Sequence, residues 1–235
     1  MEVKAILFDK DGTLFDFNKT WGPWFFDILN ELSQGSHKTL NELSLLLDYD
    51  LKNKVFKFNS PFIAGTEGET VSKIISFMPN LKKDKLVKWL SNKSKDVSGS
   101  PVLNLKKTLK ELHEMNILMG IATNDNEIGA QNQLKESKID HFFNYVYGSD
   151  SGFGFKPECG MQDEFLRVSK LHPKHVLMVG DSYADIISGK KAGMKTIGVL
   201  TGVLNRHQLE KQADVVLSSI NELPNLIYKL NVNSL

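Results

Sequence analysis

Short apolar segments recur along the chain, separated by longer stretches with a helical pattern. Each apolar segment is continuous rather than alternating, which is typical of strands buried on both faces of a parallel sheet. The predicted strands are Val3–Phe8, Ile117–Ala122, Tyr145–Tyr147, Val176–Val179, Thr196–Val199 and Val215–Leu217. The helices predicted between them are Val102–Met115, Glu127–Lys138, Met161–Ser169, Ser182–Ala192 and Asn205–Gln212. This alternation indicates βαβ units and a three-layer α/β fold with a doubly wound parallel sheet.

One region departs from this alternation. Residues 17–97 contain no buried-strand pattern, and we expect an all-helical insertion there. Its predicted helices are Trp24–Leu32, Leu40–Leu47, Glu67–Met78 and Asp84–Ser94. Turn-forming residues separate them. The sequence therefore predicts two domains: an α/β core of residues 1–16 and 98–235, and a helical domain of residues 17–97.

Composition narrows the class of protein. The chain has 235 residues, of which 41% are hydrophobic and 24% charged, as in ordinary globular proteins. A formal net charge of +1 gives no reason to expect nucleic acid or an anionic membrane as a partner. We find no signal peptide and no apolar run near the roughly 20 residues that span a bilayer. With a single cysteine, Cys159, no internal disulfide can form, and we expect a cytoplasmic protein.

Polar residues directly follow four of the predicted strands. Ligands bind at the carboxyl ends of the strands in parallel α/β sheets, so these positions mark the candidate site. The residues concerned are Asp9, Asp11, Thr123, Asn124, Lys156, Asp181 and Asp185. Carboxylates, a hydroxyl group and a lysine on one edge suit the binding of a metal ion and a phosphate.

Each loop also has a purely structural interpretation. An Asp-Gly pair between apolar segments is a hairpin signal, and Ser182-x-x-Asp185 fits a helix capping box. Thr123 could begin a helix, and a single lysine such as Lys156 is usually a solvated surface residue. The occurrence of all four loops in this order, each after a strand, favours a site over four coincidences.

Together these loops resemble the phosphatases of the haloacid dehalogenase superfamily. The segment FDKDGTLFD is similar to the first motif, Asp-x-Asp-Gly-Thr, and IATN is similar to the second. GFKP resembles the third motif and VGDSYAD the fourth. The helical insertion is similar to a C1-type cap, and the pattern is nearest to the phosphoglycolate phosphatases. One departure is Lys10, because a hydrophobic residue is more usual at that position of the first motif.

The resemblance implies roles for the candidate residues. Asp9 is the expected nucleophile, which forms an aspartyl-phosphate, and Asp11 is the expected general acid and base. Thr123, Lys156 and the backbone around Asn124 are expected to hold the phosphoryl oxygens. The resemblance also implies a Mg²⁺ ion, held by the Asp9 carboxylate, the Asp11 backbone carbonyl and Asp181, with Asp185 assisting directly or through water.

The expected activity is hydrolysis of a small phosphate monoester, with 2-phosphoglycolate as the first candidate, followed by sugar phosphates and nucleotides. A sugar phosphomutase remains an alternative because the related mutases share the paired aspartates. A non-catalytic binding module is a second alternative, against which the intact motifs argue. Dehalogenation is disfavoured because that branch lacks the counterpart of Asp11. The sequence does not indicate an oligomeric state.

Substrate contacts in the helical domain are the least defined part of the sequence. The aromatic residues Phe17, Trp21, Trp24, Phe25 and Phe26 could face the site entrance, although packing in the interior of the domain is the better interpretation of most of them. The loop of residues 65–68 is a second candidate contact.

Overall fold

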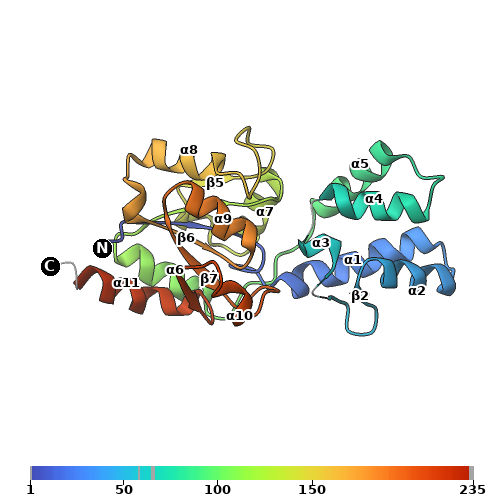
Figure 1. Ribbon diagram of the computed structural model, residues 1–235, viewed down its shortest axis with the longest axis horizontal. Helices are drawn as coiled ribbons and strands as arrows, with labels where there is room; N and C mark the ends of the chain where they lie inside the picture. Colours follow the sequence, from blue (N-terminus) through green and yellow to red (C-terminus); the bar gives the residue numbers. More distant parts are fainter. Residues whose placement is uncertain (1, 58, 65–66, 233–235) are drawn as a thin grey trace. The chain divides into compact units, whose positions relative to one another are not determined.

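The chain folds into two compact units, which a computed structural model describes for residues 2–57, 59–64 and 67–232 (Figure 1). The first unit comprises residues 1–17 and 99–235, and the second comprises residues 18–98. Each boundary is one residue later than the sequence indicated. Residues 65 and 66 of the candidate loop lie outside the described residues.

A six-stranded parallel sheet forms the centre of the first unit, in the order β5-β4-β1-β6-β7-β8. Its strands are β1 (Ala5–Phe8), β4 (Leu118–Ala122), β5 (Tyr145–Tyr147), β6 (Val176–Gly180), β7 (Lys195–Val199) and β8 (Val215–Leu217). Each strand lies within about two residues of its predicted range. All four residues of β1 are fully buried, as expected for a strand covered on both faces.

Helices cover both faces of this sheet (Figure 1). Alternate residues of β1 point to opposite faces. Ile6 and Phe8 join one apolar cluster with α6 (Leu105–Glu114), α7 (Glu127–Glu136) and α11 (Leu223–Val232). Leu7 joins a second cluster with α8 (Gly160–Ser169), while α9 (Tyr183–Lys191) packs on β6 and β7. The predicted three-layer α/β fold is therefore confirmed.

The register of the sheet brings three strand ends to one level. Phe8 at the end of β1 lies opposite Ile121 of β4 and Val179 of β6. The next amide, that of Asp9, donates a hydrogen bond of 2.8 Å to the carbonyl oxygen of Val179. The loops that follow these three strands consequently meet at one edge.

Aromatic side chains pack the interior of the second unit. Its helices are α1 (Phe17–Ser33), α2 (His37–Leu46), α3 (Pro61–Ala64), α4 (Glu67–Phe77) and α5 (Lys83–Ser94). The ring of Phe25, which is 1% exposed, lies 4.8 Å from the ring of Phe56 and 5.2 Å from that of Phe62. Trp21 is also buried, so the interior-packing interpretation is confirmed for Phe25 and Trp21.

A short antiparallel hairpin in this unit was not anticipated. It pairs β2 (Tyr49–Asp50) with β3 (Val55–Phe56), and two residues per strand are too few to give a recognisable pattern in the sequence. The hairpin packs tightly on α1: a Cβ atom on Gly22 would lie 2.0 Å from the carbonyl oxygen of Lys54.

Several other elements differ from the sequence-based expectation, and α3 was not predicted because four residues give no helical repeat. Helix α1 begins seven residues earlier than predicted, although it contains Pro23, and α10 (Arg206–Leu209) is shorter than predicted. Helix α11 was not predicted. Short 3₁₀ helices occur at Asp140–Phe142, Pro173–His175 and Ile220–Glu222.

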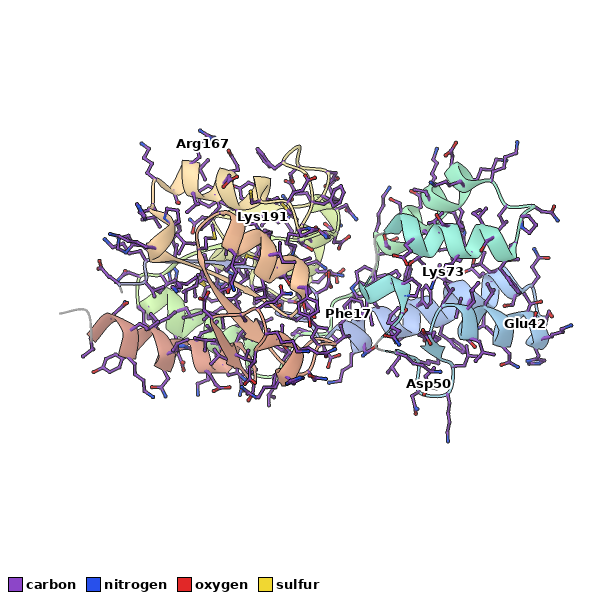
Figure 2. The ribbon with its side chains drawn as sticks, viewed as in Figure 1. Phe17, Glu42, Asp50, Lys73, Arg167 and Lys191 are labelled. Atoms are coloured by element: carbon purple, nitrogen blue, oxygen red, sulfur yellow. The ribbon has the colours of Figure 1, made fainter. Side chains whose placement is uncertain are left out.

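Charged side chains such as Arg167 and Lys191 extend outward from their helices (Figure 2). Among the described residues, no helix combines the length and apolar character needed to cross a membrane.

Candidate active site

Three buried carboxylates meet at the carboxyl edge of the sheet. Asp9 follows β1, and Asp181 and Asp185 follow β6. One carboxylate oxygen of each residue lies within 4.8 Å of the others. Asp185 is 1% exposed, Asp181 4% and Asp9 6%. Negative charges this close and this well shielded from water require positive charge nearby.

Lys156 supplies part of that charge. It lies in the loop between β5 and α8 and is buried at 4% exposure. Its Nζ atom lies 2.5 Å from Oδ1 of Asp9 and 2.6 Å from Oδ1 of Asp185. Burial opposes its charged form, but the carboxylates of Asp185 and Asp9 raise the pKa of Lys156 overall. This lysine is thus a buried bridge between the loop after β1 and the first turn of α9 (Tyr183–Lys191), and not a solvated surface residue.

Asp185 has a structural partner as well. Its Oδ2 atom accepts hydrogen bonds from the amide and the hydroxyl group of Ser182, at 3.0 and 2.6 Å. The Ser182 hydroxyl in turn accepts a bond from the Asp185 amide, which completes a capping box at the start of α9. The capping interpretation is therefore confirmed, and the same residue belongs to the carboxylate cluster. The cap fixes the orientation of a carboxylate that also contacts Lys156.

Two glycines enclose the carboxylate of Asp181. A Cβ atom on Gly12, whose φ angle is +86°, would lie 2.4 Å from Oδ2 of Asp181, and one on Gly202 would lie 1.7 Å from it. The loop after β7 is joined to the first motif because the Thr201 hydroxyl donates a 2.7 Å hydrogen bond to the carbonyl oxygen of Gly12. This loop was not assigned a role from the sequence.

The pKa values of the cluster indicate a shortage of positive charge. Burial raises the pKa of Asp9 to about 7, although Lys156 opposes the rise. Burial and the neighbouring carboxylates of Asp9 and Asp185 raise the pKa of Asp181 well above its usual range. A divalent cation would stabilise the charged forms. Three carboxylate oxygens are hard ligands of the kind that Mg²⁺ prefers, so these residues fit such an ion.

Asp11 belongs to a second cluster, formed around the buried Lys10, which the sequence did not reveal. Lys10, which is 0% exposed, has its Nζ atom 2.7 Å from Oδ2 of Asp11 and 3.2 Å from Oδ2 of Asp125. The same Nζ donates a hydrogen bond to Oε1 of Gln133 on α7. Lys10 was noted in the sequence as a departure from the first motif, but nothing there indicated its partners.

The predicted phosphate-binding residues occupy the loop after β4. Thr123 is 1% exposed, and its Oγ1 atom accepts a 3.1 Å hydrogen bond from the Asp125 amide. The Asn124 side chain bonds the backbone of Lys156 twice, at 2.8 and 3.0 Å. Asn124 thereby anchors the loop that carries Lys156. The predicted contact of its backbone with a phosphate stays a prediction. Helix α7 starts after Asn126, so Thr123 does not cap it.

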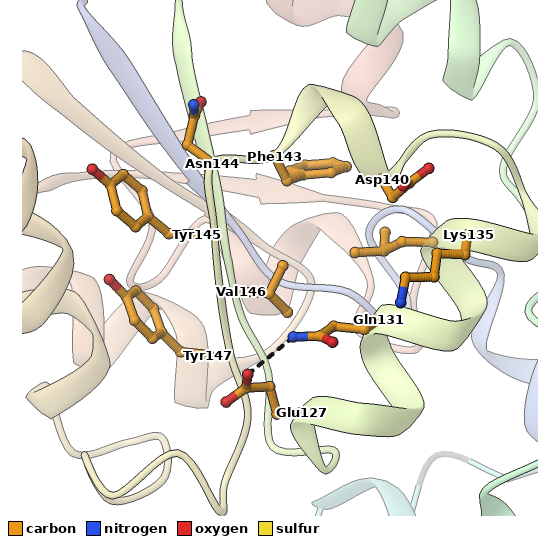
Figure 3. A pocket seen from close by; sticks show the side chains of 10 residues that line it. Glu127, Gln131, Lys135, Asp140, Phe143, Asn144, Tyr145, Val146 and Tyr147 are labelled. Carbon is orange, nitrogen blue, oxygen red and sulfur yellow. Dashed lines mark hydrogen bonds between the residues drawn. The ribbon is translucent and has the colours of Figure 1, made fainter.

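A cavity of about 400 Å³ lies between α7 and the edge strand β5 (Figure 3). Its lining mixes rings such as Tyr145 with polar groups, and Gln131 donates a 3.0 Å hydrogen bond to Glu127 there. None of the lining residues is a clustered carboxylate or Lys156. The cavity offers no convergent catalytic groups, so the chemistry of the strand-end loops decides the location of the candidate site.

The chain is similar to known proteins in both its sequence and its fold. The chain is 27% identical to pyrophosphatase PpaX of Bacillus mycoides over 98% of its own length and 100% of the relative's. The fold is similar to that of a predicted phosphoglycolate phosphatase from Haemophilus somnus, with a TM-score of 0.73, 18% identity and coverage of 96% and 98% of the two chains. It is also similar to β-phosphoglucomutase of Clostridium difficile, with a TM-score of 0.68, 18% identity and coverage of 99% and 98%.

A family assignment follows from the sequence match itself. Residues 6–199, which include the carboxylate cluster, Lys156 and the whole helical insertion, match the haloacid dehalogenase-like hydrolases. The family and the hydrolase class predicted from the motifs are confirmed. This chain belongs to the haloacid dehalogenase-like hydrolase family.

Proposed function

We propose that this hydrolase is a Mg²⁺-dependent phosphatase, which releases phosphate from a small substrate through an aspartyl-phosphate on Asp9. The contact of Asp9 with Lys156 inside the buried carboxylate cluster is the observation that carries the proposal. Lys156 holds the Asp9 carboxylate at the carboxyl edge of the sheet, where parallel α/β sheets bind their ligands, so an Asp9 oxygen is positioned to attack a phosphoryl group bound there.

In the proposed reaction, an Asp9 oxygen attacks phosphorus and the bond from phosphorus to the leaving oxygen breaks. Asp11 gives a proton to that oxygen, then takes a proton from the water that attacks the aspartyl-phosphate. Inorganic phosphate leaves and the Asp9 carboxylate is restored. The Thr13 hydroxyl, 3.4 Å from Oδ2 of Asp9, helps to orient the nucleophile, and Lys156 offsets charge on both Asp9 and the phosphoryl group.

The proposed metal site uses Asp9 and Asp181, with the backbone carbonyl of Asp11 and a contribution from Asp185. A bound Mg²⁺ offsets negative charge on the reacting phosphoryl group. The contacts of Asp185 with Lys156 and Ser182 support a role for it through water more than a direct bond. The unit of residues 18–98 is proposed to be the cap domain, because it is inserted after the first motif.

Two substrates have specific support. Similarity over the full length to a pyrophosphatase favours pyrophosphate. The motif pattern and the similarity in fold to a predicted phosphoglycolate phosphatase favour 2-phosphoglycolate. Both are small phosphate compounds, and the near-zero net charge provides no basic track for a polyanion such as nucleic acid.

A substrate panel tests the proposal. Phosphate release is measured with pyrophosphate, 2-phosphoglycolate, sugar phosphates, nucleotides and p-nitrophenyl phosphate, with and without Mg²⁺. We expect Mg²⁺-dependent release from pyrophosphate or 2-phosphoglycolate. If a sugar phosphate is isomerised faster than it is hydrolysed, the protein is a mutase and the proposed phosphatase activity is wrong. If no substrate of the panel is turned over, the result favours the alternative of a non-catalytic binding module.

A further inference from the structure

Lys10 is buried as completely as any charged residue that the structure describes. Its exposure is 0%, whereas Lys156, the other buried lysine of the described chain, is 4% exposed. Burying an ammonium group is costly unless hydrogen bonds and opposite charges compensate it. A hydrophobic side chain would fill this position without that cost, so the charge needs an explanation.

The partners of Lys10 come from three separate segments. Asp11 is its neighbour in the first motif, Asp125 lies in the loop after β4, and Gln133 is on α7. Lys10 therefore ties the first motif to the next strand-end loop and its helix. Of these three partners, only Asp11 has a proposed part in the reaction. The other two hold the ammonium group beside it.

The two buried lysines serve different carboxylates. Lys156 contacts Asp9 and Asp185, which belong to the proposed nucleophile and metal cluster. Lys10 contacts Asp11 and Asp125 instead. An ammonium group 2.7 Å from one carboxylate oxygen of Asp11 restricts the rotation of that side chain. A freely rotating acid would meet the leaving oxygen only part of the time.

We propose that Lys10 is a positioning residue, which holds the Asp11 carboxylate in its working orientation and is itself anchored by Asp125 and Gln133. This inference rests on the proposed function, in which Asp11 protonates the leaving oxygen. The purely structural alternative is that Lys10 only ties three segments together. The two roles differ in how a substitution affects substrates with different leaving groups.

The leaving group separates the two roles. An alkyl phosphate releases a poor leaving group that needs a proton, whereas p-nitrophenyl phosphate releases a phenolate that departs without one. The quantity to compare is kcat/KM, because it reports the steps up to departure of the leaving group and excludes the later hydrolysis of the aspartyl-phosphate. Loss of an oriented acid lowers kcat/KM selectively for the alkyl phosphate. General loosening of the site lowers it for both substrates.

The first variant is Lys10→Met, which keeps the length of the side chain and removes its charge. We expect kcat/KM to fall about tenfold or more with 2-phosphoglycolate or another alkyl phosphate, and less than about threefold with p-nitrophenyl phosphate. Asp11→Asn should show the same selectivity. Lys135→Met, an exposed lysine on the same helix as Gln133, is the matched control and should change neither value. Equal losses for the two substrates with Lys10→Met overturn the inference.

A second variant covers the case in which Lys10→Met does not fold. In Lys10→Met, the carboxylates of Asp11 and Asp125 face each other without a cation, and their repulsion could prevent folding. The double variant Lys10→Met, Asp125→Asn therefore removes the charge of Asp125 and retains Asp11. Selective loss with the alkyl phosphate is again the expected result. Equal loss again contradicts it.

A double-mutant cycle tests the contact without turnover. The urea midpoints of Lys10→Met, Asp11→Asn and the combined variant are compared with that of the wild type. Shifts that do not add show that Lys10 and Asp11 interact, and additive shifts overturn the inference. If the wild-type protein hydrolyses no substrate of the panel, the proposed function fails and the inference fails with it, whereas wild-type turnover with equal losses in Lys10→Met overturns the inference alone.

Discussion

The interiors of the two units differ in chemistry. Among the residues that the structure describes, the buried polar side chains of the 18–98 unit are hydroxyl groups: Thr20, Ser33, Ser44, Ser60 and Thr70. Its centre is a cluster of rings around Phe25. In the described part of the α/β unit, five charged side chains are buried instead: Asp9, Lys10, Lys156, Asp181 and Asp185. Four of them lie in loops that follow strands, and Asp185 lies in the first turn of α9, just after β6.

This contrast separates residues that stabilise from residues that react. Burial of rings and aliphatic groups stabilises the folded state, so the interior of the 18–98 unit contributes to stability. Buried carboxylates cost free energy unless a cation or ligand compensates them, so the strand-end loops are arranged for chemistry at the expense of stability. Substitutions in the two interiors should therefore change different measurements.

The largest expected effect is on the reaction rate, from Asp9→Asn. The amide has nearly the same shape but cannot act as a nucleophilic carboxylate, so kcat should fall by about a thousandfold or more. Far-ultraviolet circular dichroism and tryptophan fluorescence should match the wild type. A purified variant that retains a substantial part of the wild-type rate would show that Asp9 is not the nucleophile.

The reciprocal experiment is Phe25→Ala in the 18–98 unit. Removal of a buried ring should lower the free energy of unfolding by about 3–5 kcal/mol. All three tryptophans, Trp21, Trp24 and Trp89, lie in this unit, so tryptophan fluorescence during urea unfolding reports on it directly.

Leu45→Ala is the matched control for that experiment. Leu45 is 71% exposed on α2 of the same unit, so its removal should change the free energy of unfolding by no more than about 0.5 kcal/mol. Similar losses for the buried ring and the exposed leucine would contradict the role assigned to the aromatic interior.

Within the charged interior, Asp181 and Asp185 should differ in how strongly their removal affects the Mg²⁺ dependence of turnover. Chelation with EDTA should stop turnover, and added Mg²⁺ should restore it. Asp181→Ala should raise the Mg²⁺ concentration for half-maximal activity by roughly tenfold to a hundredfold, and by more than Asp185→Ala does. The reason is that Lys156 and Ser182 already engage the Asp185 carboxylate. The reverse ranking would make Asp185 the direct ligand.

The charged interior should also make stability depend on pH, an effect that an apolar interior lacks. The pKa of Asp9 rises from 3.8 to about 7 on folding, so the folded protein binds more protons than the unfolded chain between these values. Stability therefore falls as pH increases through that window, and the loss is complete above it. The Tm of EDTA-treated protein should be lower at pH 8 than at pH 5, with a weaker pH dependence in Asp9→Asn. A Tm that does not fall between pH 5 and pH 8, or that falls equally in Asp9→Asn, would contradict the raised pKa of Asp9.

The amino-acid sequence was most informative where a pattern repeats. Continuous apolar segments predicted all six strands of the parallel sheet, because burial on both faces leaves no polar position in a strand. The hairpin β2–β3 escaped prediction because each of its strands has two residues. In the first motif, the sequence predicted a site at Asp9, but it indicated only that Lys10 stands where a hydrophobic residue is more usual. The burial of Lys10 depends on Asp125 and Gln133, which are more than a hundred residues away.

The sequence by itself determined the alternation of strands and helices, the insertion, and the type of residue that follows each strand. These are local properties of the chain, set by the spacing of apolar side chains and by short motifs. The tertiary structure alone decided which charges meet: Lys156 with Asp9 and Asp185, and Lys10 with Asp11 and Asp125. The reason is that electrostatic energy depends on distance and burial in the folded protein, and neither is fixed by separation along the chain.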